Sequence, residues 1–275
     1  MKVREALAAA AARLRGVSAT PRLDAELLMA HALGAGREAM LLGRLDASAP
    51  AAFDALVERR LGHEPVAYIT GRRAFWTIEL EVGPGVLIPR PDSETLIEAA
   101  LAHFGAAGPA RILDLGTGPG TLLLAALDQW PGATGLGIDA SEAALDFARR
   151  NAARLGLAGR AAFRRGDWGE GLDERFDLIL ANPPYVEAGA RLAPELTRWE
   201  PAAGLYGGAD GLDAYRRLAP QLAPLLAPGG IVCLEIGSGQ EAAARGLLEM
   251  RGFTIASRSD LGGNVRALIL HACRE

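Results

Sequence analysis

The sequence predicts an α/β fold, in which a small helical domain and a β-hairpin precede a mostly parallel sheet of seven strands. Two observations support this prediction. From residue 93 onward short apolar segments alternate with helical stretches, whereas the residues before about 70 show helical periodicity only. At 275 residues, half of them apolar, the chain is also long enough for one large domain and a smaller companion.

The predicted helical domain covers residues 1–71. One helix is predicted to begin at Thr20-Pro21, which are typical of an N-cap and a first helical position. Its apolar face is predicted from residues that recur at helical spacing, namely Leu23, Leu27 and Ala30. A further helix should begin near Ser48 and end at Leu61.

A hairpin linker is predicted for residues 72–92, between the two domains. Residues 76–82 alternate between apolar and polar, as in a half-buried strand. Gly83-Pro84-Gly85 is typical of a turn, so residues 86–88 are expected to pair back on that strand.

Residues 93–275 are predicted to form the sheet domain. The candidate strands are residues 111–115, 134–139, 161–166, 176–181, 230–236, 253–259 and 265–271. Helical stretches separate most of them, which is typical of a parallel sheet with helices on both faces. Only Gly262-Gly263-Asn264 separates the last two strands. This connection is too short for a parallel crossover, so one strand should be reversed.

The composition favours a cytoplasmic protein. No segment approaches the roughly 20 unbroken apolar residues that a membrane span needs, and the first residues lack the apolar centre of a secretory signal. Two cysteines, Cys233 and Cys273, are too few for a metal cluster, and we expect neither a disulfide nor a metal site. A net charge of −4 argues against non-specific capture of nucleic acid, although it does not exclude a local basic patch.

A glycine-rich loop follows the first candidate strand and is the first sign of a cofactor. Its residues are Gly116, Thr117, Gly118, Pro119 and Gly120. Glycines allow positive φ and let backbone amides approach a ligand at the carboxyl end of a strand. The spacing Gly-x-Gly-x-Gly differs from the Gly-x-Gly-x-x-Gly of dinucleotide sites, which disfavours NAD. Asp114, just before the loop, either contacts the ligand or fixes the loop.

The next two strands also end in polar or aromatic side chains. Asp139 lies about twenty residues beyond the loop, where a carboxylate can accept hydrogen bonds from both ribose hydroxyls. After the third strand, Asp167 can accept from an adenine amino group and Trp168 can cover an adenine face. Three strand ends therefore converge on one adenosine.

The fourth strand leads into Asn182-Pro183-Pro184-Tyr185, which we interpret as the substrate-binding motif. Two prolines hold the backbone extended and remove two amide donors, so that carbonyl oxygens are presented without competition. The Asn182 side-chain oxygen and the Pro183 carbonyl can each accept one hydrogen of an NH₂ group, while Tyr185 packs against the planar group that carries it.

This motif predicts methylation of a conjugated nitrogen. Such a nitrogen is a poor nucleophile because its lone pair is delocalised, and two acceptors favour the pyramidal form and aim the lone pair at the sulfonium methyl of S-adenosylmethionine. Orientation alone can supply up to roughly 7–11 kcal/mol. Asn182, Pro183 and Tyr185 are the candidate catalytic residues, S-adenosylhomocysteine is the expected product, and no metal or covalent intermediate is required.

The sequence resembles the HemK/PrmC family of protein-glutamine N5-methyltransferases over nearly its whole length. The resemblance is carried by residues 64–71 (EPVAYITG), Phe75-Trp76, residues 87–94 (LIPRPDSE), Glu200-Pro201, residues 207–212 (GGADGL) and residues 234–237 (LEIG), together with residues 182–185. Ile88-Pro89-Arg90-Pro91 is more discriminating than the tetrapeptide at 182–185, which DNA adenine methyltransferases share.

The resemblance implies a seven-stranded, Rossmann-like S-adenosylmethionine-dependent methyltransferase sheet. It also implies that peptide chain release factors are the partners, with the glutamine of their Gly-Gly-Gln motif as the methylated residue, and that neither nucleic acid nor a membrane is a stable partner. Residues 116–120, Asp139, Trp168 and Asn182 would bind the cofactor, and residues 182–185 the glutamine. Pro119 and Ser93 depart from the family, which more often has a small polar residue and Thr there.

Three other functions are compatible with parts of this sequence. A DNA adenine N6-methyltransferase meets the same chemical demands on a flipped base, but the sequence has no separate basic recognition domain. A non-catalytic cofactor-binding protein would not need both Asn182 and Tyr185. A small-molecule methyltransferase would leave the helical domain without an evident purpose, whereas that domain can serve as a docking surface for a protein or as a lid.

Overall fold

The computed structural model describes residues 1–272, so Cys273 lies outside the described residues. The chain divides into two compact units. The helical unit contains Met1–Arg72 together with Leu192–Trp199, and the sheet unit contains Arg73–Arg191 together with the residues from Glu200 onward.

The helical unit packs short helices around one apolar core. Its helices are α1 (Val3–Leu14), α2 (Pro21–Ala32), α3 (Arg37–Gly43), α4 (Ala52–Leu61), α5 (Val66–Thr70) and α9 (Pro194–Trp199). The buried face of α2 differs from the predicted one, because Leu23 is 40% exposed while Leu28 and Met29 are fully buried. Asp24, which is also buried, forms an ion pair with Arg60 of α4 at 2.7 Å.

The hairpin that begins the sheet unit also differs from the prediction. Its strands are β1 (Arg72–Phe75) and β2 (Ile78–Glu81), so the turn lies at Trp76 rather than at residues 83–85. Trp76 has φ 54°, and its amide donates to the Glu94 carboxylate at 2.8 Å. Residues 86–88 form no strand. The predicted pairing was wrong because contacts distant in sequence fix this turn.

The seven-stranded sheet confirms the predicted fold. Its strands are β3 (Arg111–Leu115), β4 (Thr134–Asp139), β5 (Ala161–Arg165), β6 (Phe176–Ala181), β7 (Leu226–Glu235), β8 (Phe253–Ser259) and β9 (Val265–Ala272). They lie in the order β5-β4-β3-β6-β7-β9-β8, and β9 runs in the direction opposite to the other six. Strand β7 begins before the predicted residue 230, because a bulge carries Gly229 and Gly230 within the strand.

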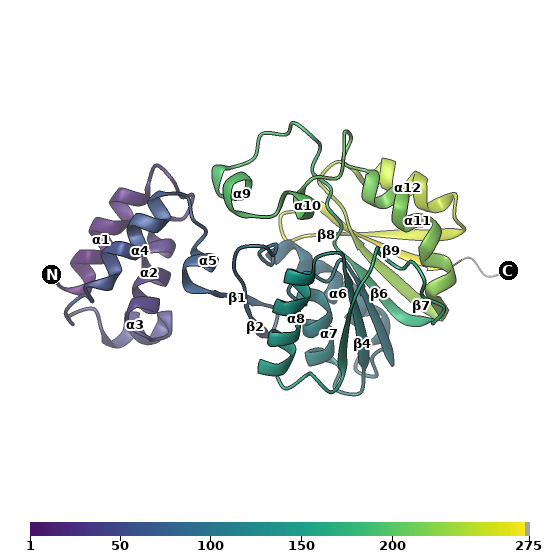
Figure 1. Ribbon diagram of the computed structural model, residues 1–275, viewed down its shortest axis with the longest axis horizontal. Coiled ribbons are helices and arrows are strands. Elements are labelled where there is room, and N and C mark those ends of the chain that lie inside the picture. Colours follow the sequence, from purple (N-terminus) through teal and green to yellow (C-terminus); the bar gives the residue numbers. More distant parts are fainter. Residues whose placement is uncertain (273–275) are drawn as a thin grey trace. The chain divides into compact units, whose positions relative to one another are not determined.

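Helices cover both faces of this sheet (Figure 1). The helices on one face are α6 (Glu94–Phe104), α7 (Thr121–Gln129) and α8 (Glu142–Arg154), and those on the other are α11 (Asp213–Leu225) and α12 (Glu241–Glu249). The chain leaves β3 toward β4 on one side, and β6 lies on the other side of β3. A ligand crevice is expected at such a switch of strand order, beyond the carboxyl ends of the strands.

Two further expectations concern the membrane and the cysteines. In the part of the chain that the structure describes, no helix is both long and apolar enough to cross a membrane. Cys233 is a free thiol in β7, and burial raises its pKa to about 12. A thiol held protonated is a poor nucleophile, in agreement with a passive role for Cys233.

Candidate active site

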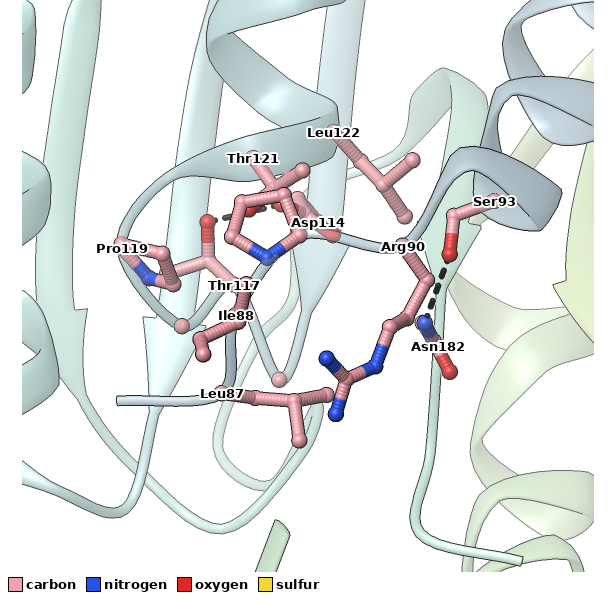
Figure 2. Close-up of a pocket in the computed structure, with 13 residues that line it drawn as sticks. Leu87, Ile88, Arg90, Ser93, Asp114, Thr117, Pro119, Thr121, Leu122 and Asn182 are labelled. Atoms are coloured by element: carbon pink, nitrogen blue, oxygen red, sulfur yellow. Dashed lines mark hydrogen bonds between the residues drawn. The ribbon is translucent and has the colours of Figure 1, made fainter. Parts of the chain in front are cut away.

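A cavity of about 560 Å³ lies beyond the carboxyl ends of β3 to β6, within the range of small-molecule sites. Most of the predicted cofactor residues line it: Gly116, Gly118, Asp139, Asp167, Trp168 and Asn182. A second cavity of about 50 Å³ shares Gly116, Gly118 and Asn182 with the first and adds Thr117 and Pro119 (Figure 2). Gly120 is absent from the described linings of both, and its backbone begins α7 instead.

The glycine-rich loop gives its amides to the protein rather than to the cavity. The amides of Gly116 and Thr117 both donate to the Ile138 carbonyl, at 2.8 and 2.9 Å, and the amide of Gly118 donates to Asp139 at 2.8 Å. The amide of Gly120 donates within the loop. The loop amides therefore do not face the cavity, contrary to the expectation. Pro119 has no amide hydrogen to donate, and the amides of its neighbours Gly118 and Gly120 are bonded within the protein.

Asp139 ends β4 and holds the loop through its side chain. One carboxylate oxygen accepts from the Gly118 amide and the other from the Ser141 amide, each at 2.8 Å. Each oxygen has a second lone pair, so the carboxylate keeps acceptor capacity toward the cavity that it lines. This arrangement suits a pair of ribose hydroxyls.

Trp168 and Asp167 form the opposite part of the lining. Trp168 has φ 54°, and its ring lies 3.2 Å from where a Cβ on Gly116 would stand, so it covers the loop from one side. The ring also packs against the core of the sheet, which gives it a structural role as well. The Asp167 carboxylate pairs with Arg217 of α11, a partner that was not predicted.

The Asp114 side chain is fully buried beneath the loop and fixes it, which is one of the two roles expected from the sequence. One carboxylate oxygen accepts from the Thr117 hydroxyl at 2.7 Å and from the Leu123 amide at 3.2 Å, which fixes the loop to α7. The other oxygen has no partner among the described residues, and Asp114 lines the smaller cavity. Burial raises the pKa of this carboxyl to about 7.

Asn182 lies where the two cavities meet, directly after β6. Its amide nitrogen donates to the Ser93 hydroxyl at 3.0 Å, and its oxygen points away from Ser93 (Figure 2). Among residues 1–272 no donor is bonded to that oxygen, so it is available to a substrate. Pro184 also lines the larger cavity, whereas Pro183 and Tyr185 are absent from the described linings of both cavities.

Tyr185 is fixed at both ends. Its hydroxyl donates to the Glu235 carboxylate at 3.2 Å, and its carbonyl accepts from Gln240 at 3.0 Å. Burial, and then the charge of Glu235, raise the pKa of the phenol above its usual range. Gly211 lies behind it with φ 72°, and a Cβ there would stand 2.3 Å from the Tyr185 carbonyl, so only glycine fits.

The segment before α6 brings further side chains to the site. Glu200 is buried and accepts from the Ile88 amide at 3.0 Å and from Arg90 at 2.6 Å. Asp92 pairs with Arg266 of β9 at 3.1 Å. Sequence reasoning assigned none of these residues a role in the site; the only signal was that Arg90, Asp92 and Glu200 fall in segments that carry the family resemblance.

Both units match known protein families. Residues 5–71 match the PrmC N-terminal domain family, and residues 108–240 match a methyltransferase domain family. The release factor glutamine methyltransferase of Rhodospirillum rubrum is 48% identical over 255 residues, covering 90% of this chain and 78% of that protein. The chain belongs to the release factor glutamine methyltransferase family. A second member, from Cereibacter sphaeroides, is 43% identical over 274 residues and covers 97% of both chains.

The sheet unit of this family member has the general methyltransferase fold. A methyltransferase from Pyrococcus furiosus superposes with a TM-score of 0.55 at 20% identity, covering 71% of this chain and 89% of that chain. This likeness concerns the fold alone. The family assignment depends on the sequence relatives, and the 5–71 match distinguishes this family from methyltransferases in general.

Proposed function

We propose that this protein transfers a methyl group from S-adenosylmethionine to the side-chain amide nitrogen of the glutamine in the Gly-Gly-Gln motif of peptide chain release factors. The observation that carries the proposal is the Asn182 amide, which lies between the two cavities with its nitrogen bound to Ser93 and its oxygen free. This is the arrangement that an NH₂ substrate beside a methyl donor requires.

The described residues fit this cofactor. The larger cavity can take an adenosine, with Asp139 toward the ribose and Asp167 and Trp168 toward the base. The unpartnered Asp114 oxygen supplies a buried acceptor at the smaller cavity. Residues 116–120 shape the loop that the cofactor would contact. When bound, S-adenosylmethionine supplies an electrophilic methyl group on a sulfonium ion.

The chain's own residues bind and orient the glutamine. The Asn182 oxygen and the Pro183 carbonyl accept one amide hydrogen each, and the Tyr185 ring packs against the planar amide. These contacts favour the pyramidal nitrogen and direct its lone pair along one line. Because they strengthen as the nitrogen leaves the amide plane, they lower the barrier rather than merely tighten binding.

The helical unit is proposed to dock the protein substrate. Residues 5–71 match the PrmC N-terminal domain family, and a docking surface gives a glutamine within a large protein a second point of attachment. In this proposal residues 72–92 link that unit to the methyltransferase domain of residues 93–275. Translation factors act in the cytoplasm, so we propose that location, with no stable nucleic-acid or membrane partner.

A labelling experiment tests the activity. The protein and a labelled methyl donor are incubated separately with a release factor, with its Gln→Ala variant in the Gly-Gly-Gln motif, and with duplex DNA. We expect label on the unaltered release factor only. Equal label on the variant would contradict the assigned residue, and label on DNA alone would favour an adenine N6-methyltransferase.

A further inference from the structure

A side-chain amide has two ends, and only one of them suits the reaction. An asparagine presents an acceptor oxygen on one side and a donor NH₂ on the other. If Asn182 turned over, its NH₂ would meet the NH₂ of the substrate, and two donors would face each other without an acceptor. Something outside Asn182 must therefore select its orientation.

Ser93 is the immediate neighbour that makes this selection. Its hydroxyl is 2% exposed and lies 3.0 Å from the Asn182 nitrogen. A hydroxyl has one hydrogen to donate and lone pairs with which to accept. If that hydrogen is given to a third group, the serine oxygen can only accept from Asn182, and the amide nitrogen must then face Ser93.

Glu235 supplies the third group. It ends β7, is fully buried, and lies near enough to the Ser93 hydroxyl for that hydroxyl to lower the carboxyl pKa. One oxygen accepts from the Tyr185 hydroxyl at 3.2 Å, and the other has no partner of good geometry among the described residues. An ionised carboxylate accepts hydrogen bonds but donates none, so the Tyr185 hydroxyl donates to one oxygen, and the other, buried and unpartnered, can accept from the Ser93 hydroxyl.

We propose, on the basis of the methyl transfer proposed above, that Glu235 is the positioning residue of this site. Through the Ser93 hydroxyl it fixes which end of the Asn182 amide faces the substrate, and through the Tyr185 hydroxyl it holds the ring beside the substrate amide. Glu235 itself does not touch the reacting atoms. One buried carboxylate thus orients two groups that hold the glutamine.

The charge state of Glu235 should then control turnover. The groups that face it are Tyr185 after β6, Ser93 and Asp92 before α6, and Arg266 of β9, while the Tyr215 hydroxyl donates to its backbone carbonyl. Burial raises the pKa of the carboxyl to about 7. A protonated Glu235 could donate to Ser93 and reverse the direction of the hydrogen bonds, so kcat should fall as pH drops through about 7.

The test compares Glu235→Gln with Ser93→Ala and Ser93→Thr in the full-length protein, with Glu249→Gln on the exposed face of α12 as the charge control. Gln can donate to Ser93 as the protonated acid does. We expect kcat for release factor methylation to fall on the order of 10- to 100-fold in Glu235→Gln and Ser93→Ala, with an unchanged dissociation constant for S-adenosylhomocysteine. Ser93→Thr keeps a hydroxyl at this position and should retain most of the wild-type kcat.

Two further readouts separate orientation from folding and from the choice of substrate. The wild-type kcat should show an acidic limb that Glu235→Gln lacks. Without any release factor, the side-chain ¹⁵N resonance of Asn182 should shift with a midpoint near pH 7 in the wild type and not in Glu235→Gln. Wild-type kcat and pH profile in Glu235→Gln, or an Asn182 resonance indifferent to that substitution, would overturn the inference. Because the NMR readout needs no substrate, it stands even if the release factor is not labelled.

Discussion

The two halves of the site are built differently. On the cofactor side, at the ends of β3, β4 and β5, a wide cavity is lined by half-exposed side chains such as Asp139 and Trp168 and by a loop whose amides are already bonded. On the substrate side, at the ends of β6 and β7, Asn182 and Tyr185 each rest on a buried side chain.

This difference corresponds to two demands of the reaction. A cofactor that is bound by many separate contacts tolerates small displacements of any one of them. A nitrogen that must be held pyramidal in a single direction does not, because a small error in orientation removes most of the benefit. Substitutions on the cofactor side should therefore weaken binding, and those on the substrate side should slow turnover.

The largest effect is expected at Asn182. Asn182→Ala removes one of two acceptors for the substrate amide and should lower kcat by about 100- to 1000-fold. Cofactor affinity should change much less, because the other lining residues remain. Single-turnover labelling together with calorimetric titration of S-adenosylhomocysteine measures both. A loss confined to cofactor affinity would reverse the assignment of the two halves.

Asp139 should show the complementary behaviour. Asp139→Ala removes the carboxylate proposed for the ribose and should weaken cofactor binding on the order of 10- to 100-fold, as expected for hydrogen bonds to a charged group. At saturating cofactor kcat should be nearly retained. Asp139→Asn is the matched control, since it keeps one acceptor for the Gly118 amide. If kcat fell as far as in Asn182→Ala, the contrast between the halves would not hold.

A substitution at Gly211 tests whether Tyr185 must be held in place for turnover. Gly211→Ala places a methyl group against the Tyr185 carbonyl in a backbone conformation with φ 72°, and should cost about 1–3 kcal/mol in the free energy of unfolding. The same displacement of Tyr185 should lower kcat. Gly239→Ala, at φ 82° but with no atom within 4 Å of the added Cβ, controls for backbone strain alone. Equal kcat in the two variants would show that Tyr185 need not be held.

The last effect concerns stability and pH rather than turnover. The pKa of Asp114 is raised from 3.8 to about 7 by burial, so between these values the folded state holds a proton that the unfolded state has lost. The free energy of unfolding must therefore fall as pH rises through this window. Asp114→Asn should flatten that slope, as measured by urea denaturation across the window. An unchanged slope would show that Asp114 is already ionised in the folded protein.

Much of the fold follows from the sequence because its signals are local. Short apolar segments that alternate with helical stretches mark the strands, and the short turn before β9 determines the direction of that strand. The failures arise where distant side chains decide. The Asp24–Arg60 ion pair buries a charged side chain of α2 that the apolar pattern does not indicate, and the Glu94 carboxylate accepts from the amide in the turn at Trp76.

The site divides in the same way. Residues that follow strands, such as Asp139 and Asn182, could be assigned from order and spacing, since parallel strands end at one edge. Ser93, Glu200 and Glu235 could not, because each acts by touching a residue that is distant along the chain. Likewise, the loop amides were expected to face a ligand because the sequence does not show that Ile138 and Asp139 accept them.

Helix α9 belongs to the helical unit although it follows the substrate motif by only a few residues. It is held there by the Glu195 carboxylate, 2.8 Å from the buried guanidinium of Arg60. The N-terminal unit is therefore not a detachable module. Deleting residues 1–72 would leave Glu195 without its partner Arg60. Grafting those residues onto another methyltransferase would transfer the helical unit without α9. An engineered transfer of this unit must therefore include both segments.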